Sequence, residues 1–440
     1  MNTSAMPTTR PRAVRRGSHQ QGAATLIVVM VLFFVMSLVA AYSSRNIIFE
    51  QRTSSNMQVA NVVQETADAG MEWVLSLVNS GNITDLCVGN ADPAAPTPSF
   101  RQRYLSTDTV SGNVSGSLAY PAGATTVVAT CGFDAATQNW ACACPADGTA
   151  ANTPALSPAF GVRFVVPAAQ RPGVIRAEIV ACARSSAECL AFKDSDPSFC
   201  RGTMCALIAL HSGLKSPPTA AVMARGAVNA PLTAINAAAG ASSKTVIAGG
   251  DVDEAVVTFV GPPGTPPAST YVEMDPQLSK TLPATAAFTA ERMFAAFFGV
   301  WPSTYDLHPG AVAVPCAGGC NSQAVRDAAA VNPDRILLLQ GDVALDGGGA
   351  IGSATNPVLL VVQGNLTFSA PTDVYGFVYA RQANWVTSGA GRIIGGAASQ
   401  GSISGTGAYT IVRDSTVLNL LRQRTGSFVK VPGSWVDFQP

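Results

Sequence analysis

The sequence has few charged side chains and very little histidine. Of its 440 residues, 27 are Lys or Arg and 27 are Asp or Glu, so the formal net charge is zero. A protein that binds nucleic acid needs a basic surface against the phosphates, and this composition offers none. Only three histidines are present, and the cysteines include no second close pair at zinc spacing. We therefore expect no nucleic-acid partner, no metal site and no cofactor.

Motifs that would indicate catalysis are also missing. Gly347–Gly352 satisfies G-x-G-x-x-G, but a strand is expected after it, so it lacks the helix N-terminus that would hold a pyrophosphate. Ser212–Lys215 gives S-x-x-K without a companion motif. His211 and His308 are expected to be isolated structural residues. The sequence predicts a protein that is not an enzyme.

The longest uncharged stretch lies near the N-terminus. Residues 23–42 carry no charge, and at ~1.5 Å per helical residue they span ~30 Å, the thickness of a bilayer's hydrocarbon core. The leader before them, residues 1–22, contains Arg10, Arg12, Arg15 and Arg16. Because positive charge stays on the cytoplasmic side, we expect a single-pass anchor in the inner membrane with the remaining chain exported.

Three interpretations of this segment compete. A secretory signal peptide would be cleaved near Val39–Ala41, but the apolar cores of such peptides run ~7–15 residues, and this one is longer. An unprocessed anchor would keep the leader. The third interpretation is a leader that resembles those of type IV pilins, which are cut at a glycine on the cytoplasmic side of the helix. We favour the third, with Gly22, Ala23 and Ala24 as the processing positions and a methylated new N-terminus at Ala23 or Ala24.

The helix is expected to continue past the membrane segment. Residues 43–79 contain no proline, and their only glycine is Gly70. Apolar positions recur at steps of three and four, which is typical of a helix that packs one face on a protein core. These positions are Val59, Val62, Val63, Thr66, Gly70, Trp73, Val74 and Leu77. We predict one stem helix over residues 23–80.

Three patches in this region resemble the N-terminal signature of PilX-type pilus assembly proteins. They are Gln21-Gly-Ala-Ala-Thr-Leu-Ile-Val28, Phe49-Glu-Gln-Arg-Thr-Ser-Ser-Asn56 and Gln64-Glu-Thr-Ala-Asp-Ala-Gly-Met-Glu72. The closing segment Val431–Phe438 also resembles the end of such proteins. The resemblance implies a minor pilin-like subunit that takes part in type IV pilus assembly. The partners it implies are other pilins, pilus assembly proteins, a prepilin peptidase and membrane lipid.

One position departs from the pilin pattern. Major pilins carry a glutamate five residues into the mature helix, and Ile27 or Val28 stands there in this chain, depending on the cut. In the family, that carboxylate pairs with a neighbour's N-terminal amine, so its absence favours a priming or tip position over a bulk position. Two alternatives stay open: a surface adhesin or other binding module mounted on a pilin helix, and a type II secretion pseudopilin.

All ten cysteines follow the membrane segment, which indicates disulfides in an oxidising compartment. Close spacing makes three pairs candidates, although sequence alone leaves the connectivity open. The candidates are Cys182 with Cys189, Cys200 with Cys205, and Cys316 with Cys320. A metal site built on Cys142 and Cys144, which are too close to bridge each other easily, is the weaker alternative.

Short apolar runs separated by turn residues divide the exported part. We expect an α+β protein in which the stem helix leads into a cysteine-rich β domain stapled by disulfides over 81–220. First solenoid strands are expected over 221–258, a Pro-rich and helical insertion over 259–334, β-solenoid repeats over 335–412 and a C-terminal cap over 413–440.

The repeats are the second strongest signal in the chain. Similar segments begin at Gln340, Gln363, Gln382 and Gln400, and each is too short to bury a core alone. Stacking them predicts a parallel β-solenoid, with a glycine-rich antiparallel domain as the alternative. We expect one buried column formed by Val358, Leu360, Val362, Phe368, Val374, Val378, Trp385, Ile393 and Ile403. Leu359, Val361 and Thr367 are expected to point the other way.

Overall fold

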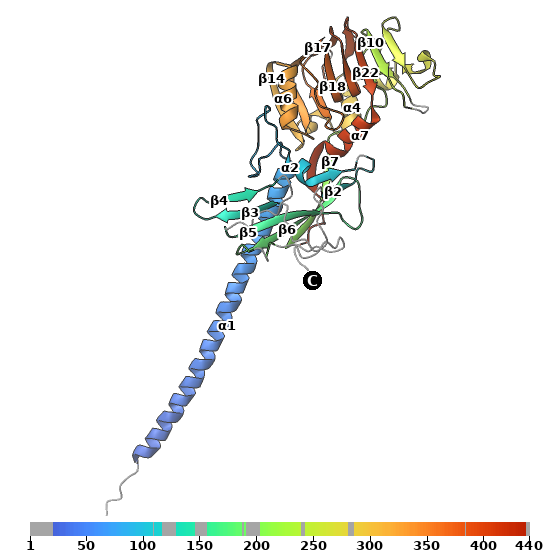
Figure 1. The fold of residues 1–440 in the computed structure, drawn as a ribbon. Helices are drawn as coiled ribbons and strands as arrows, with labels where there is room; N and C mark the ends of the chain where they lie inside the picture. Colours follow the sequence, from blue (N-terminus) through green and yellow to red (C-terminus); the bar gives the residue numbers. More distant parts are fainter. Residues whose placement is uncertain are drawn as a thin grey trace, which may run out of the picture. The chain divides into compact units, whose positions relative to one another are not determined.

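A computed structural model describes residues 21–108, 110–116, 129–145, 156–186, 189–190, 203–238, 243–279, 286–382 and 384–436 (Figure 1). Cys200 and residues 1–20 of the expected leader lie outside these ranges. The chain divides into two compact units, Met1–Asn61 and Val62–Pro440. The long N-terminal helix, α1 (Gln21–Val78), supplies the described part of the first unit and begins the second.

The last turns of α1 pack on the sheet of a head domain. Ala67, Met71 and Val74 are buried in one cluster with side chains of that sheet. Gly70 faces the same sheet, and a Cβ at this position would lie 2.9 Å from Ile179 Cγ2, so only glycine permits this close approach. The expected apolar stripe lies on this packed face from Val63 to Leu77, whereas its first member, Val59, is exposed.

The head sheet is antiparallel and contains six strands in the order β23-β7-β6-β5-β3-β4. Their bounds are β3 (Ala129–Asp134), β4 (Asn139–Ala143), β5 (Ala159–Val165), β6 (Val174–Cys182), β7 (Met204–Ser212) and β23 (Gly426–Lys430). Before them come α2 (Phe100–Tyr104) and the hairpin of β1 (Leu105–Thr107) and β2 (Val114–Gly116).

The edge strand β23 comes from the C-terminal end of the chain. It pairs antiparallel with β7, with Gly426 opposite Ser212 and Lys430 opposite Ile208. Residues 213–425 are therefore an insertion between two neighbouring strands of the head. The stretch 413–440 was expected to be one cap, and the structure corrects this: its helix α7 (Ser415–Arg424) covers solenoid strands, whereas β23 completes the head sheet. Strand pairing this distant in sequence leaves no local pattern.

The insertion is a parallel β-solenoid, as the repeats predicted. In Figure 1 its strands lie side by side above the head sheet. Its first strands are β8 (Val222–Ala224), β9 (Val228–Asn229), β10 (Leu232–Ile235), β11 (Val246–Ala248), β12 (Val257–Val260) and β13 (Tyr271–Val272). The later ones are β14 (Ala311–Asn321), β15 (Ile336–Asp346), β16 (Val358–Val362), β17 (Leu366–Ala370), β18 (Thr372–Ala380), β19 (Asn384–Thr387), β20 (Gly391–Ser399), β21 (Ser402–Gly405) and β22 (Tyr409–Arg413).

The glutamine-led repeat segments pair in parallel, which excludes the antiparallel alternative for these strands. Leu366 of β17 lies opposite Val343 of β15 and Trp385 of β19, and Ile403 of β21 lies opposite Trp385. The order of the rungs differs from the order of the sequence. The last rung, β20 to β22, pairs with the first strands β8 to β10, so the chain enters the solenoid in the middle of the stack.

Helices connect and cover the two halves of the solenoid. They are η1 (Pro267–Ser269), α3 (Pro276–Ser279), α4 (Ala286–Phe298), α5 (Pro302–Tyr305), α6 (Ser322–Val331) and α7. Leu359 and Val361 point outward under this cover and are buried with Phe294, Phe297 and Phe298 of α4. The run Val358–Val362 is thus buried on both faces, which explains why it is apolar throughout.

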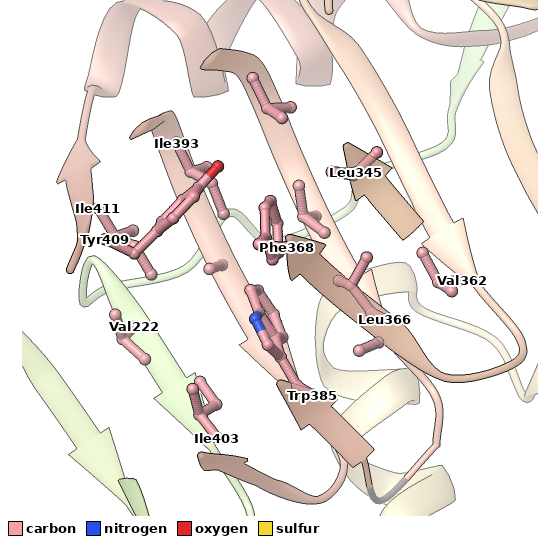
Figure 2. Close-up of a cluster of buried hydrophobic side chains, with 14 of the residues drawn as sticks. Val222, Leu345, Val362, Leu366, Phe368, Trp385, Ile393, Ile403, Tyr409 and Ile411 are labelled. Atoms are coloured by element: carbon pink, nitrogen blue, oxygen red, sulfur yellow. The ribbon is translucent and has the colours of Figure 1, made fainter. Parts of the chain in front are cut away.

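The inside of the solenoid is a single apolar core (Figure 2). All nine side chains expected in the buried column belong to it, so the expected inward phase is confirmed. Figure 2 shows Phe368 beside Trp385 and Tyr409; the centroid of its ring lies 5.7 Å and 4.4 Å from theirs. Thr367, one residue earlier in β17, is half-buried and lies outside this core.

A charged side chain should destabilise the protein strongly on the inner face of β17 and only slightly on its outer face. Phe368→Lys places an ammonium in the dry core, and we expect a loss of about 4 kcal/mol or more of unfolding free energy, because nothing there pairs with it. Thr367→Lys, at an outward position, is the matched control and should change stability by less than about 1 kcal/mol. Urea unfolding followed by circular dichroism measures both; equal losses would contradict the assigned inward phase of β17.

Candidate functional site

The first candidate is the exposed part of α1. Residues 25–61 are all exposed, and the first charged residue of this stretch is Arg45. Large apolar side chains dominate it, with Phe33 at 72% and Phe34 at 65% exposure. Among the described residues it is the one helix long and apolar enough to cross a membrane. Water is a poor solvent for such a surface, so lipid or other apolar helices must cover it.

The expected processing positions lie at the beginning of this helix. Gly22, Ala23 and Ala24 fall in the first turn of α1, which begins at Gln21, and their side chains are outside the described part. Ile27 and Val28 are both exposed and apolar. The backbone is therefore helical through the proposed cut, and these processing positions remain a prediction.

The second candidate is the joint between the head and the solenoid. It lies where the chain leaves β7 for the solenoid and where it returns to β23. The guanidinium of Arg101, from α2, is buried and donates hydrogen bonds to the backbone oxygen of Val78, to Asn79 Oδ1 at 2.9 Å and to Gly426 O at 2.8 Å. A further hydrogen bond reaches Arg424 O at 3.1 Å. Burial lowers the pKa of Arg101 to about 10, so the group stays charged at neutral pH. One side chain thus connects the end of α1 to the segment where the solenoid returns to the head.

Glycine residues let the backbones at the joint approach closely. Gly426 has φ of +141°, and a Cβ there would clash with the backbone oxygen of His211. A Cβ on Gly310 would lie 2.6 Å from the carbonyl carbon of Gly426. The loop that contains Gly310 leads into β14. The backbone at this end of the solenoid therefore lies in close contact with the first residue of β23.

The joint also brings together the two histidines that were expected to be isolated, and this corrects that expectation. His211 Nδ1 of β7 lies 2.7 Å from His308 Nε2, and the ring centroids are 4.8 Å apart in a stacked arrangement. The backbone N–H of Gly310 donates to His308 Nδ1 at 2.8 Å. Burial, followed by the nearby His211, Arg335 and Arg101, lowers the pKa of His308 to about 4. Ninety-seven residues separate the pair, so no local motif could reveal it.

Polar groups line the remaining space of the joint. One cavity of about 510 Å³ lies between Asn82 and Gln102 of the head and Arg335 and Asn356 of the solenoid. Asn82 bridges its walls, because its N–H donates to Val331 O at 3.0 Å and its Nδ2 to Ala330 O at 2.8 Å. Both acceptors lie at the end of α6, so that helix is fixed to the segment that follows α1.

The G-x-G-x-x-G segment noted in the sequence forms a turn in the solenoid. Gly347, Gly348, Gly349 and Gly352 all have positive φ and form the turn before β16. Arg326 donates to Gly347 O at 2.8 Å, which holds this turn against α6. The G-x-G-x-x-G segment therefore precedes a strand, as expected.

The cysteines form disulfides both within the head and in the solenoid. Two of the three candidate pairs are present, Cys182–Cys189 and Cys316–Cys320. Cys205 is disulfide-bonded, and Cys200 lies outside the described residues. Cys87–Cys144 and Cys131–Cys142 were missed, because their partners are 57 and 11 residues apart and close spacing was the only criterion. Among the described residues no cysteine is free.

The disulfides give a test in solution. No described cysteine is free, so we expect no free thiols among the ten cysteines when the unreduced protein is unfolded. Each closed loop should stabilise the fold by ~2–4 kcal/mol. Thiol counting with and without a reductant makes the measurement. Several free thiols per chain, or zinc bound stoichiometrically, would contradict the disulfide assignment.

The joint gives a second test. Gly426→Ala should cost at least ~2 kcal/mol of unfolding free energy, because the new methyl group clashes with His211 O and the φ is unfavourable for alanine. Gly89→Ala is the matched control, because a Cβ there meets nothing within 4 Å. Thermal unfolding compares the two variants; similar stability in both would show that the close approach at Gly426 is not required.

Comparisons with known proteins agree with the sequence on the N-terminal segment. Residues 21–72 match the PilX N-terminal family, so the resemblance noted in the sequence is confirmed over this segment. No curated protein matches the chain. Among solved structures, the competence-associated pilin ComZ from Thermus thermophilus is similar at 10% identity, over 86% of this chain and 97% of that chain. Its TM-score of 0.22 is too low to indicate a shared fold.

Proposed function

We propose that this chain, whose N-terminal segment is of the PilX type, is a minor pilin-like subunit of a type IV pilus system. Residues 23–42 would anchor it in the inner membrane, with the head and solenoid exported. The observation that carries the proposal is α1 itself: its PilX-matched residues include both the exposed apolar stretch and the turns that are buried in the head. A subunit built in this way offers the apolar helix to lipid before assembly and to other pilin helices afterwards.

Two features favour a priming or tip position over a bulk position. Ile27 and Val28 provide no carboxylate for a neighbour's N-terminal amine, although that pairing is implied for major pilins. The solenoid, residues 213–425, is inserted at the edge of the head sheet through β7 and β23. In a helical fibre every bulk subunit must fit between neighbours on all sides, whereas a subunit at the end has one free side that can accommodate a large insertion.

A deletion strain tests this function. Loss of surface fibres in electron micrographs, restored by the wild-type gene, is the expected result. Fibres that persist while attachment is lost would favour the adhesin alternative. Intact fibres combined with loss of a secreted enzyme would favour a type II secretion pseudopilin.

Processing of the leader gives a separate prediction. The mature chain should begin at Ala23 or Ala24, because Gly22 stands at the boundary between the arginine-rich leader and the apolar helix. Gly22→Val should block the cut and leave the full leader in place, whereas Gly17→Val, elsewhere in the leader, should not. Intact mass spectrometry of the purified membrane protein distinguishes them; a mature start at Tyr42 would mean an ordinary signal peptide.

A further inference from the structure

The solenoid is connected to the head by two chain segments that lie side by side, and these are the crossings between the two. The described chain leaves the head after Ser212 of β7 and returns at Gly426 of β23, and Gly213 N–H donates to Thr425 O at 2.8 Å between them. Contacts around these crossings fix the orientation of the solenoid on the head. They include the hydrogen bonds of Arg101 and Asn82 and the histidine pair, in which His211 directly precedes Ser212.

The hydrogen bonds define which ring nitrogens carry protons. Gly310 N–H donates to His308 Nδ1, so this nitrogen is unprotonated and the proton of the neutral ring is on Nε2. Nε2–H then donates to His211 Nδ1, which must also be unprotonated. The observed contacts are complete only when both rings are neutral. An added proton on His308 Nδ1 would face the N–H of Gly310, and one on His211 Nδ1 would face Nε2–H.

The surroundings oppose a positive charge on the pair. Arg101 from α2 and Arg335 from the segment before β15 both act electrostatically on His308. Tyr305 of α5 lies 5.7 Å from the His308 ring, and its hydroxyl donates to Gly213 O at 2.6 Å.

The carboxylates that lie closest in sequence to His308 and to Arg335 are already paired. Asp306 binds Arg381 at 3.0 Å, and Asp334 binds Arg424 at 3.1 Å. Protonation of the histidines therefore adds charge to a site that contains two guanidinium groups. A proton on His308 Nδ1 removes the hydrogen bond from the N–H of Gly310, and one on His211 Nδ1 removes the hydrogen bond between the rings.

We propose that His211 and His308 form a pH-sensitive latch between the head and the solenoid, closed when both rings are neutral and released in acid. Release would free the segment 306–310 from β7 and loosen the end of the solenoid that begins with β14. The latch belongs to this joint whatever the chain assembles with, so it does not depend on the proposed function.

The direction of the pH effect follows from linkage. The pKa of His308 is about 4 in the closed joint, and an exposed histidine titrates near 6.5. Between these values the open state binds more protons than the closed state, so stability of the closed joint rises with pH. The latch is fully effective above about pH 6.5 and is lost as pH falls towards about 4.

Hydrogen exchange on the full chain in detergent tests the latch. Peptides covering 306–312 and 424–430 should lose protection on the order of 10-fold from pH 7.5 to pH 5, after correction for the intrinsic exchange rate. Peptides of the solenoid core strand β16 should lose less than about twofold. The doubly substituted chain His211→Asn, His308→Gln is uncharged at both pH values and can keep a donor and an acceptor between the two positions. Its joint should show no pH response.

A matched control removes a charge elsewhere. Asp373→Asn breaks the exposed ion pair with Arg392 in the solenoid and should leave the pH response of the joint unchanged. An equal pH response in the wild type and in the double variant would overturn the latch.

Imidazole ¹⁵N spectra give a readout that is independent of the variants. The expected result is that His308 stays neutral at pH 6 and protonates only together with the loss of protection. A His308 ring that is charged at pH 6 while the joint remains protected would overturn the proposal.

Discussion

The pairing of β7 with β23 is the constraint on which the rest of the structure depends. These two strands complete the head sheet, and the whole solenoid lies between them in the chain. The head therefore cannot close until the solenoid has brought β23 back to its place. Loop-closure entropy opposes such a distant pairing, and the joint offsets it with the buried hydrogen bonds of Arg101 and close backbone contacts at Gly426.

The order of rungs follows from the same constraint. If the solenoid were stacked in simple chain order, its last strand would lie far from its first, and β23 could not reach β7. Instead β8 and β20 are neighbours, so the entry and exit of the insertion are close together. The helical segment between β13 and β14 carries the chain from one end of the stack to the other, and its phenylalanines cover the outer apolar face of the solenoid strands.

Local patterns were enough to predict the parts of this fold but not their connections. The uncharged run from Ala23 has the length of a membrane span, and the glutamine-led repeats alternate as stacked strands do, so the helix and the inward phase of Phe368 followed from sequence. The strand β23, the disulfide Cys87–Cys144 and the contact between His211 and His308 join residues far apart in the chain. No spacing rule reaches them, because each depends on where the insertion returns to the head.

The central claim is that the exposed apolar part of α1 is an assembly helix of the pilin type. Site-specific photocrosslinking in cells tests it most directly, with the crosslinker at Phe34 and a control at Met274 on the solenoid, both well exposed. The account predicts that Phe34 crosslinks to the N-terminal helices of other pilin-type subunits, in membranes and in sheared fibres, while Met274 does not. Crosslinks from Phe34 to lipid alone, with the chain absent from fibres, would contradict it.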